Sequence, residues 1–302
     1  MTPGKTHLLL VNPSAGGGRV RELLPLAQGA LDRHGIDYHV VETTGIEHGC
    51  VEARMASAAG EVVVVMSGDG LVGQVGGTLA NTGASFGVLP AGRGNDFARA
   101  LGIPSEIEGA VDVLAAGHVR EIDVGEVNDK RFLCIASCGF DSDANRIANE
   151  ARRLKGQTVY IYAALRALAA WKPATFTLEF DGTRKQVTGY TVAAANTTTY
   201  GGGMIAAPDA QCDDGLLEIG VSGNVGKLRF LRGLTQIFKG EHRETLQVQS
   251  WKAAQVRIEA DRPFAVYADG DPIAELPATV RLLRRSLRVI SPPTAAEAEA
   301  ER

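Results

Sequence analysis

Several features that would assign this chain to a specialised class are scarce or absent. The four cysteines, Cys50, Cys134, Cys138 and Cys212, have no C-x-x-C spacing, which argues against a zinc site and fits reduced thiols in a cytosol. No apolar run is long enough to span a bilayer. The first residues carry one early lysine and a short apolar run, which favours a first strand over a signal peptide.

The overall charge is too small to draw the chain toward nucleic acid. The net charge is −4, so no nucleic-acid partner is expected, and a membrane contact would require a local basic patch. The six histidines are scattered without the spacing of metal ligands. The composition is otherwise that of a globular protein, with 45% hydrophobic and 22% charged residues over 302 positions. This length suits two domains that each bury a core.

Residues 61–99 hold the most informative pattern. The apolar run 62–66 is typical of a strand covered on both faces, and it ends in Ser67-Gly68-Asp69-Gly70. A second short strand, 86–89, is followed by the glycine-rich residues 90–96. Glycines at the end of a strand let backbone N–H groups approach a phosphate. Two such loops at the carboxyl edge of a parallel sheet predict a nucleotide crevice, with Asp69 available for a metal or a proton.

The hydrophobic patterns predict two kinds of domain. Strands at 7–11 and 36–41 alternate with helices at 19–33, 47–59 and 106–116, as a parallel doubly wound sheet requires. From about residue 119, strand-like runs follow one another at 121–127, 131–137, 175–180, 185–195, 216–221, 246–250, 255–260, 264–268 and 279–283. Turn signals such as Asp181-Gly182 and Asp269-Gly270 separate several of them.

The second half is therefore predicted to be an antiparallel β-sandwich with helices inserted near 142–170 and 225–239. A last strand, 287–290, could return to the first domain, and the charged, alanine-rich tail from Pro292 is expected to fray. We expect an α/β nucleotide-binding domain over 1–120, which 286–302 could complete, and a sandwich domain over 121–285.

The ordered set of motifs resembles the diacylglycerol kinase catalytic-domain family, which includes bacterial lipid kinases, sphingosine kinases and ceramide kinases. The family is related at a distance to NAD kinases and phosphofructokinases, whose nucleotide domains the first half should share. The motifs cover nearly the whole chain: Asn12-Pro13-Ser14-Ala15-Gly16, Ser67-Gly68-Asp69-Gly70, residues 92–99, residues 200–204, residues 208–217 and Asp269-Gly270-Asp271. Each motif alone is weak, whereas six in the family's order are specific.

The resemblance implies an ATP-dependent kinase that uses Mg²⁺ and phosphorylates a lipid hydroxyl, most naturally that of diacylglycerol or a related lipid. Alternative acceptors are a sphingoid base or NAD. ATP is expected between the domains, with the lipid on the side of the sandwich domain. The family also implies a cytoplasmic enzyme that contacts the inner face of the membrane transiently, and homodimers are common within it.

The resemblance also implies roles for individual residues. Catalysis would involve Asp69, Asp269 and Asp271, with Asp271 or Asp269 favoured as the base, although the first-loop aspartate has a claim in sphingosine kinases. A structural Mg²⁺ would be held by the Asp214 carboxylate and the backbone carbonyls of Gln211 and Leu216, which are hard oxygen ligands. The nucleotide would be held by Asn12, Thr43, Ser67, Gly68, Asp69, Gly70, Gly92, Arg93, Gly94 and Asn95.

Each of these residues has a purely structural alternative. Asp69 could bond its own turn, Thr43 or Thr44 could cap the following helix, and Asp269-Gly270 could be an ordinary type I′ hairpin turn. The glycines of residues 16–18 could form a simple flexible turn, and residues 213–215 a solvated acidic one.

The chain departs from the family pattern at several positions. The family's common G-G-D-G-T-x-N-E reads S-G-D-G-L-V-G-Q here, and S-G-D-G-L resembles the sphingosine-kinase variant. Gly73 and Gln74 replace the family's Asn and Glu, and Asp271 is one methylene shorter than the family's Glu. Arg93 stands where the family has Thr or Ser, and its guanidinium could clamp phosphate oxygens or only cap the loop. These departures keep open a nucleotide-binding regulator without catalysis.

Two stretches are candidates for a membrane or lipid contact. Residues 227–239 are expected to place Leu231, Leu234 and Phe238 on one helical face among four cations. The alternative is a helix packed on the sandwich with its cations in solvent. The apolar stretch 159–171 has the same two interpretations.

Overall fold

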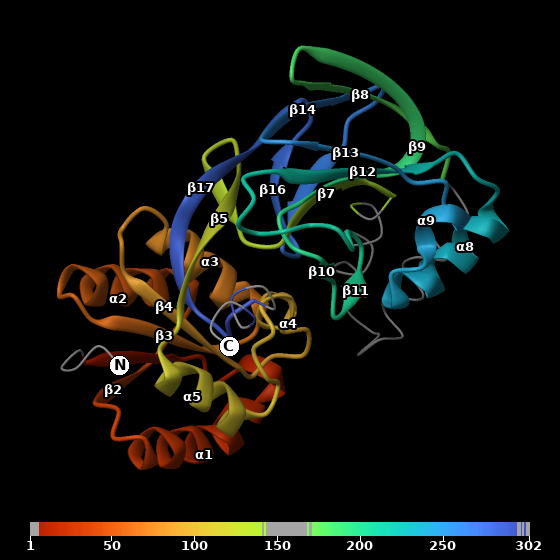
Figure 1. Ribbon diagram of the computed structural model, residues 1–302. Helices are drawn as coiled ribbons and strands as arrows, with labels where there is room; N and C mark the ends of the chain where they lie inside the picture. Colours follow the sequence, from red (N-terminus) through yellow and green to blue (C-terminus); the bar gives the residue numbers. More distant parts are fainter. Residues whose placement is uncertain are drawn as a thin grey trace. The chain divides into compact units, whose positions relative to one another are not determined.

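The computed structural model describes residues 6–140, 142, 168, 171–294, 297 and 299. The chain divides into two compact units, both shown in Figure 1. Unit 1 comprises Met1–Val124, Thr199–Gly203 and Leu283–Arg302, and unit 2 comprises Gly125–Thr198 and Met204–Leu282. The long strand β17 (Ala278–Ile290) therefore begins in unit 2 and ends in unit 1.

Unit 1 is built on a parallel sheet. Its strand order is β2 (Tyr38–Glu42), β1 (His7–Val11), β3 (Val62–Ser67), β4 (Ser85–Pro90) and the second half of β17. Every residue of β3 is buried, which explains its unbroken apolar sequence, because helices cover both faces of such a sheet. The predicted doubly wound α/β fold is confirmed.

The helices of unit 1 form two pairs. Helix α1 (Arg19–Arg33) packs on α5 (Ile107–Ala116), and α2 (Ile46–Ala58) packs on α3 (Asp69–Leu79). Figure 1 shows the two pairs on opposite faces of the sheet. A 3₁₀ turn, η1 (Ala15–Gly17), precedes α1, and a short helix, α4 (Asp96–Ala100), follows β4.

Unit 2 is an antiparallel β-sandwich, as predicted. Its strand order is β16 (Asp271–Glu275), β15 (Ala265–Ala268), β7 (Ile135–Gly139), β9 (Thr183–Ala195), β8 (Ala174–Phe180), β14 (Gln255–Ala260) and the first half of β17. Strand β12 (Leu217–Gly223) pairs with β9 and with β13 (Gln249–Ala253), and β5 (Val119–Val127) pairs with β6 (Lys130–Phe132).

An aromatic cluster fills the core of unit 2. The Tyr190 ring stacks on Phe230 at 3.9 Å between centroids, and the Phe140 ring meets Phe230 edge-on at 4.9 Å. Phe230 belongs to α8 (Lys227–Gln236), which continues into η2 (Ile237–Lys239) and is followed by α9 (His242–Thr245). The short strands β10 (Thr199–Tyr200) and β11 (Met204–Ile205) lie before β12 in the chain.

Some predicted elements differ from the structure. The expected strand 131–137 is broken into β6 and β7, because the N–H groups of Leu133 and Cys134 turn to the Asp269 carboxylate. The runs 279–283 and 287–290 are parts of one strand, β17, and residues 246–248 precede β13 instead of starting it. The predicted helix near 142–170 and most of the apolar stretch 159–171 lie outside the described residues.

Candidate active site

The two predicted nucleotide loops lie side by side in unit 1. Strands β3 and β4 are parallel neighbours that bring Ser67 opposite Pro90, and the Ala91 N–H donates to the Ser67 carbonyl at 3.0 Å. The backbones of Gly68 and Gly92 are in contact, since a Cβ on Gly92 would lie 2.4 Å from the Gly68 Cα. Only glycine permits this approach, so the two loops form one continuous backbone surface.

The loop after β1 joins the same surface. Gly16 has a φ of 61°, and a Cβ there would lie 2.6 Å from the Ala91 carbonyl oxygen. An Arg93 guanidinium nitrogen lies 3.6 Å from the place of a Gly17 Cβ, so this exposed cation reaches over the first glycine loop. Asn12 shapes that loop from its start, because its side-chain oxygen accepts the Ser14 N–H at 3.0 Å.

Asn95 and Thr43 hold the loops in shape. Asn95 adopts a left-handed φ of 52°, which asparagine tolerates better than most residues. Its side-chain oxygen accepts the Gly92 N–H at 2.8 Å, and its amide nitrogen donates to the Gly92 carbonyl at 3.3 Å. Thr43 is buried and its hydroxyl donates to the Val11 carbonyl at 3.3 Å. Gly45, and neither Thr43 nor Thr44, occupies the N-cap position of α2.

Asp69 links the two predicted nucleotide loops. Its carboxylate starts α3 and accepts the N–H of Asp96 at 2.6 Å and that of Phe97 at 3.4 Å, both at the start of α4. These partners lie far along the chain, so Asp69 is not a simple turn aspartate. Burial, and then the nearby Asp96 carboxylate, raise the pKa of Asp69, although its backbone hydrogen bonds act in the opposite direction.

Gly94 lies directly against this pair of carboxylates. A Cβ on Gly94 would lie 2.7 Å from Asp69 Oδ2 and 3.2 Å from Asp96 Oδ2. The two carboxylate oxygens therefore point toward the same place beside the second loop. Two carboxylates held this close repel each other when both are ionised. Paired carboxylates of this kind commonly surround a bound cation.

Asp96 is a site residue to which sequence reasoning assigned no role. It is 6% exposed, and its two carboxylate oxygens accept the N–H groups of Gly202 and Gly203, each at 2.7 Å. Gly201, Gly202 and Gly203 have φ of 64°, 85° and 99°, which L-residues with side chains rarely adopt. The glycine triplet and the Asp following Asn95 were both visible in the sequence, but only the fold pairs them.

Asp269 lies within a hairpin turn of unit 2, and Asp271 follows the turn. Asp269 and Gly270 have φ of 50° and 96° between β15 and β16, as a type I′ turn requires. The Asp269 carboxylate accepts the N–H groups of Leu133, Cys134 and Ile135 at 2.7, 3.0 and 3.2 Å. Asp269 is therefore a structural brace, whereas the Asp271 side chain is exposed at the start of β16.

The Asp214 carboxylate does not offer a ready place for a metal ion. Its Oδ1 accepts the Leu216 N–H at 2.9 Å, and its Oδ2 pairs with the Lys252 ammonium at 3.0 Å. Within the described part of the chain, no three His, Cys, Asp or Glu side chains gather as metal ligands would. A cation bound by Asp214 would have to displace Lys252, and ligation with the carbonyls of Gln211 and Leu216 stays a prediction.

A second cationic side chain, Arg243, pairs with the same acidic segment. Arg243 donates to Asp209 at 2.6 Å and also to the buried Glu218. The acidic residues 209, 214 and 218 are thus tied to two protein cations from elsewhere in unit 2. The buried Glu218 would carry a desolvation penalty without such a partner.

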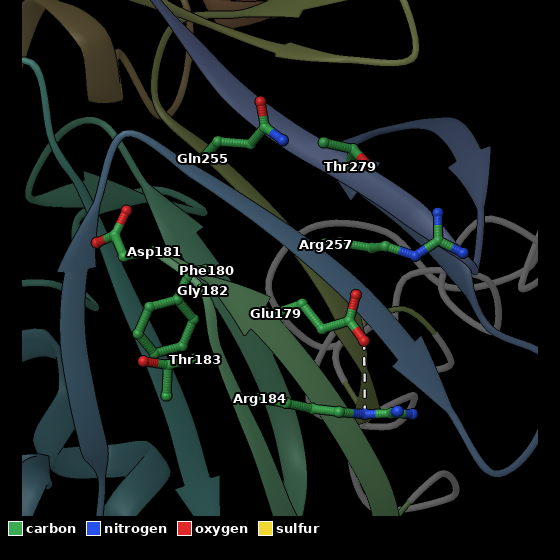
Figure 2. A pocket seen from close by; sticks show the side chains of 9 residues that line it. All are labelled: Glu179, Phe180, Asp181, Gly182, Thr183, Arg184, Gln255, Arg257 and Thr279. Carbon is green, nitrogen blue, oxygen red and sulfur yellow. Dashed lines mark ion pairs between the residues drawn. The ribbon is translucent and has the colours of Figure 1, made fainter.

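A separate hollow lies beside the β8–β9 turn in unit 2. It has a volume of about 570 Å³ and is lined by Glu179, Phe180, Arg184, Gln255, Arg257 and Thr279, among others. Figure 2 shows the lining side chains, which are mostly polar, and the ion pair between Glu179 and Arg184, whose atoms lie 3.4 Å apart. No motif residue lines this hollow, so we assign it no part in the candidate active site.

Comparisons with known proteins agree with this arrangement. The family model described as the diacylglycerol kinase catalytic domain matches residues 6–127, and that of the YegS C-terminal NAD kinase beta sandwich-like domain matches residues 134–291. A protein of Mycobacterium tuberculosis named diacylglycerol kinase is 36% identical over 293 residues, which cover 94% of each chain. One of the same name from Bacillus subtilis is 27% identical over 300 residues, covering 97% of this chain and 98% of its own.

A solved structure gives the same result for the fold. The crystal structure of a diacylglycerol kinase from Bacillus anthracis superposes with a TM-score of 0.76 at 24% identity, covering 97% of this chain and 99% of that one. The two family models together cover both units, and with the relatives they show that the protein is a lipid kinase. The chain belongs to the diacylglycerol kinase family, as its motifs predicted.

Proposed function

We propose that the protein transfers the γ-phosphoryl group of ATP to the hydroxyl of a lipid, and that the lipid is diacylglycerol. The observation that carries this proposal is the contact between Gly68 and Gly92, which joins two glycine loops into one backbone surface at the carboxyl ends of β3 and β4. Phosphoryl transfer depends mainly on positioning and on neutralising phosphate charge. The name shared by the relatives supports the choice of lipid.

The nucleotide would bind to the loops of unit 1. Backbone N–H groups of residues 67–70 and 92–95 would hold phosphate oxygens, and Arg93 would add a cation above them. Asn12 and Thr43 would act by shaping the neighbouring backbone. Mg²⁺ arriving with ATP would neutralise phosphate charge, and its own charge would favour the ionised form of Asp69.

The base that takes the proton of the lipid hydroxyl would be Asp271. Asp269 already accepts backbone N–H groups with both of its oxygens, so its capacity to accept a further proton donor is small. Asp271 is exposed two residues later, on the short strand β16. A general base contributes about 10²–10⁴-fold to the rate of such reactions.

The test is an assay with pure protein, γ-labelled ATP, Mg²⁺ and separate acceptors: diacylglycerol, sphingosine and NAD. We expect label in the chloroform-soluble product of diacylglycerol. Asp271→Asn should lose at least a hundredfold in kcat and keep its affinity for ATP, whereas Glu275→Gln, an exposed change on the same strand, should keep both. A protein that ATP stabilises against heating but that labels none of the acceptors would contradict the proposal.

The proposed substrate determines where in the cell the enzyme must act, because diacylglycerol lies in a membrane. None of the helices within the described residues is both long and apolar enough to cross a membrane. We propose that the enzyme reaches diacylglycerol by transient contact with the cytoplasmic face of a bilayer.

A further inference from the structure

The outward side of α8 and η2 combines apolar and cationic side chains. Leu228 is 87% exposed and Phe238 is 54% exposed. Arg232 and Lys239 are exposed beside them. With about 100° per residue, these four positions fall within one arc of about 120° on a helical wheel. We call this surface the α8 face.

The opposite side of the helix is fixed to the core of unit 2. Phe230 is 2% exposed and stacks on Tyr190, and Ile237 is buried. A Cβ on Gly233 would lie 2.2 Å from a Leu246 methyl carbon, so the helix packs closely there. The helix cannot roll to bury Leu228 without breaking these contacts.

Leu231 and Leu234, which the sequence places on one face with Phe238, are partly buried and pack against the core. On the same helical wheel they lie within about 40° of Phe238, so Phe238 is the exposed end of a stripe that is otherwise covered. Leu228, which the sequence did not single out, adds a second exposed apolar side chain. The packing alternative therefore holds for Leu231 and Leu234, and the membrane contact stays a prediction.

The charge around the α8 face is positive, although the whole chain is acidic. Residues 227–239 contain Lys227, Arg229, Arg232 and Lys239 and no Asp or Glu, against a net charge of −4 for the chain. Arg229 is turned to α9, where it donates to the carbonyls of Thr245 at 2.7 Å and Glu244 at 3.0 Å. Arg232 and Lys239 remain beside the exposed apolar residues, and Glu241 and Glu244 follow at the next exposed positions.

We propose that the α8 face docks on a membrane that contains anionic phospholipids. Leu228 and Phe238 insert at the level of the headgroups, and Arg232 and Lys239 lie against phosphate. Helices that lie in the interface combine these two residue types in the same way, and charge complementarity selects an anionic surface over a neutral one. The inference rests on the proposed function, since a kinase of a bilayer lipid must visit the bilayer.

Vesicle flotation of the full chain tests the proposal. We expect wild-type protein to float with vesicles of equal phosphatidylglycerol and phosphatidylcholine, to float weakly with pure phosphatidylcholine, and to be released by 0.5 M salt, because salt screens surface charge. Arg232→Gln with Lys239→Gln should lower the partition coefficient roughly tenfold or more. Leu228→Ser with Phe238→Ser should do so with either vesicle.

Matched controls separate docking from folding and from overall charge. Arg184→Gln with Lys185→Gln removes the same charge from the exposed β9 start, and Leu26→Ser with Met55→Ser removes exposed apolar groups from unit 1. Both pairs should float like wild type. Since Leu228 and Phe238 are exposed, their variants should melt within about 2 °C of wild type.

Kinase activity measured in micelles and on vesicles distinguishes the docking proposal from the kinase proposal. With diacylglycerol in detergent micelles, the Leu228→Ser, Phe238→Ser variant should turn over like wild type, whereas its rate on vesicles should fall about as far as its partition does. Wild-type flotation by this variant would overturn the docking proposal and leave the kinase proposal intact. Normal flotation of wild type without phosphorylation in micelles would overturn the kinase proposal alone.

Discussion

Replacing Gly94 by alanine is a direct test of the contact between the two glycine-rich loops and the carboxylates of Asp69 and Asp96. The new methyl group would lie 2.7 Å from Asp69 Oδ2, 3.2 Å from Asp96 Oδ2 and 3.4 Å from the Gly202 Cα. Both carboxylates are held by backbone N–H groups, so neither can move away without losing a hydrogen bond. Overpacking of this kind costs about 1–3 kcal/mol.

The matched control is Gly70→Ala, in the first turn of α3. A Cβ on Gly70 would meet nothing within 4 Å, and alanine in place of glycine stabilises a helix by up to about 1 kcal/mol. We therefore expect the two variants to change stability in opposite directions. For a unit of this size, Gly94→Ala should lower Tm by about 2–12 °C, and Gly70→Ala should leave it equal or slightly higher.

The assay is thermal unfolding followed by two probes, together with ATP binding measured by calorimetry. Gly94→Ala should also weaken ATP binding at least tenfold, because the displaced carboxylates and loop backbone surround the proposed phosphate position. If Gly94→Ala melts and binds ATP like wild type, the contact between these loops and the acidic pair is wrong.

Three further predictions concern the charged groups. Because the pKa of Asp69 is raised in the folded state, its contribution to stability is present below its unfolded pKa and lost as pH rises through the folded value. Asp69→Asn should therefore melt above wild type at pH 8, by a margin that shrinks toward pH 4, and should lose turnover; a lower Tm at pH 8 would contradict this. Asp96→Ala removes the carboxylate that accepts the part-buried N–H groups of Gly202 and Gly203 and should cost about 1–3 kcal/mol in urea unfolding, with Asp96→Asn costing less. Lys252→Met removes a partly exposed ion pair worth at most about 1 kcal/mol and frees Asp214, so Mg²⁺ at ten times its Kd should then stabilise the variant by about 1.4 kcal/mol; equal Mg²⁺ effects on Tm in the variant and wild type would argue against competition by Lys252.

The sequence predicted those helices and strands whose apolar residues form an unbroken run or recur with helical spacing. The five apolar residues of β3 and the spacing in α1 each gave the element and its approximate ends. Helix α3 was missed because Gly70, Gly73, Gly76 and Gly77 disfavour a helix in isolation, and packing against α2 outweighs that preference. Strand β16 was missed because it is short and contains Pro272.

The sequence predicted the loops of the candidate site, but not the contacts between residues far apart in the chain. The loops around Gly68 and Gly92 were expected to meet, because the carboxyl ends of neighbouring parallel strands share an edge. Nothing in the local sequence joins Asp96 to Gly203, more than a hundred positions later. The ion pair of Asp214 with Lys252 depends in the same way on the pairing of β12 with β13.

The division of β17 between the two units has a consequence for how the protein is made. The outer neighbour of β4 in the sheet of unit 1 is the C-terminal part of β17, where Arg288 and Val289 lie opposite Ser85 and Phe86. During synthesis, the edge of β4 in the first 124 residues therefore has no strand partner until nearly the whole polypeptide has left the ribosome. An unpaired edge strand in a nascent chain can pair with a wrong strand or bind a chaperone. A fragment ending before residue 283 would leave this edge of β4 unpaired permanently.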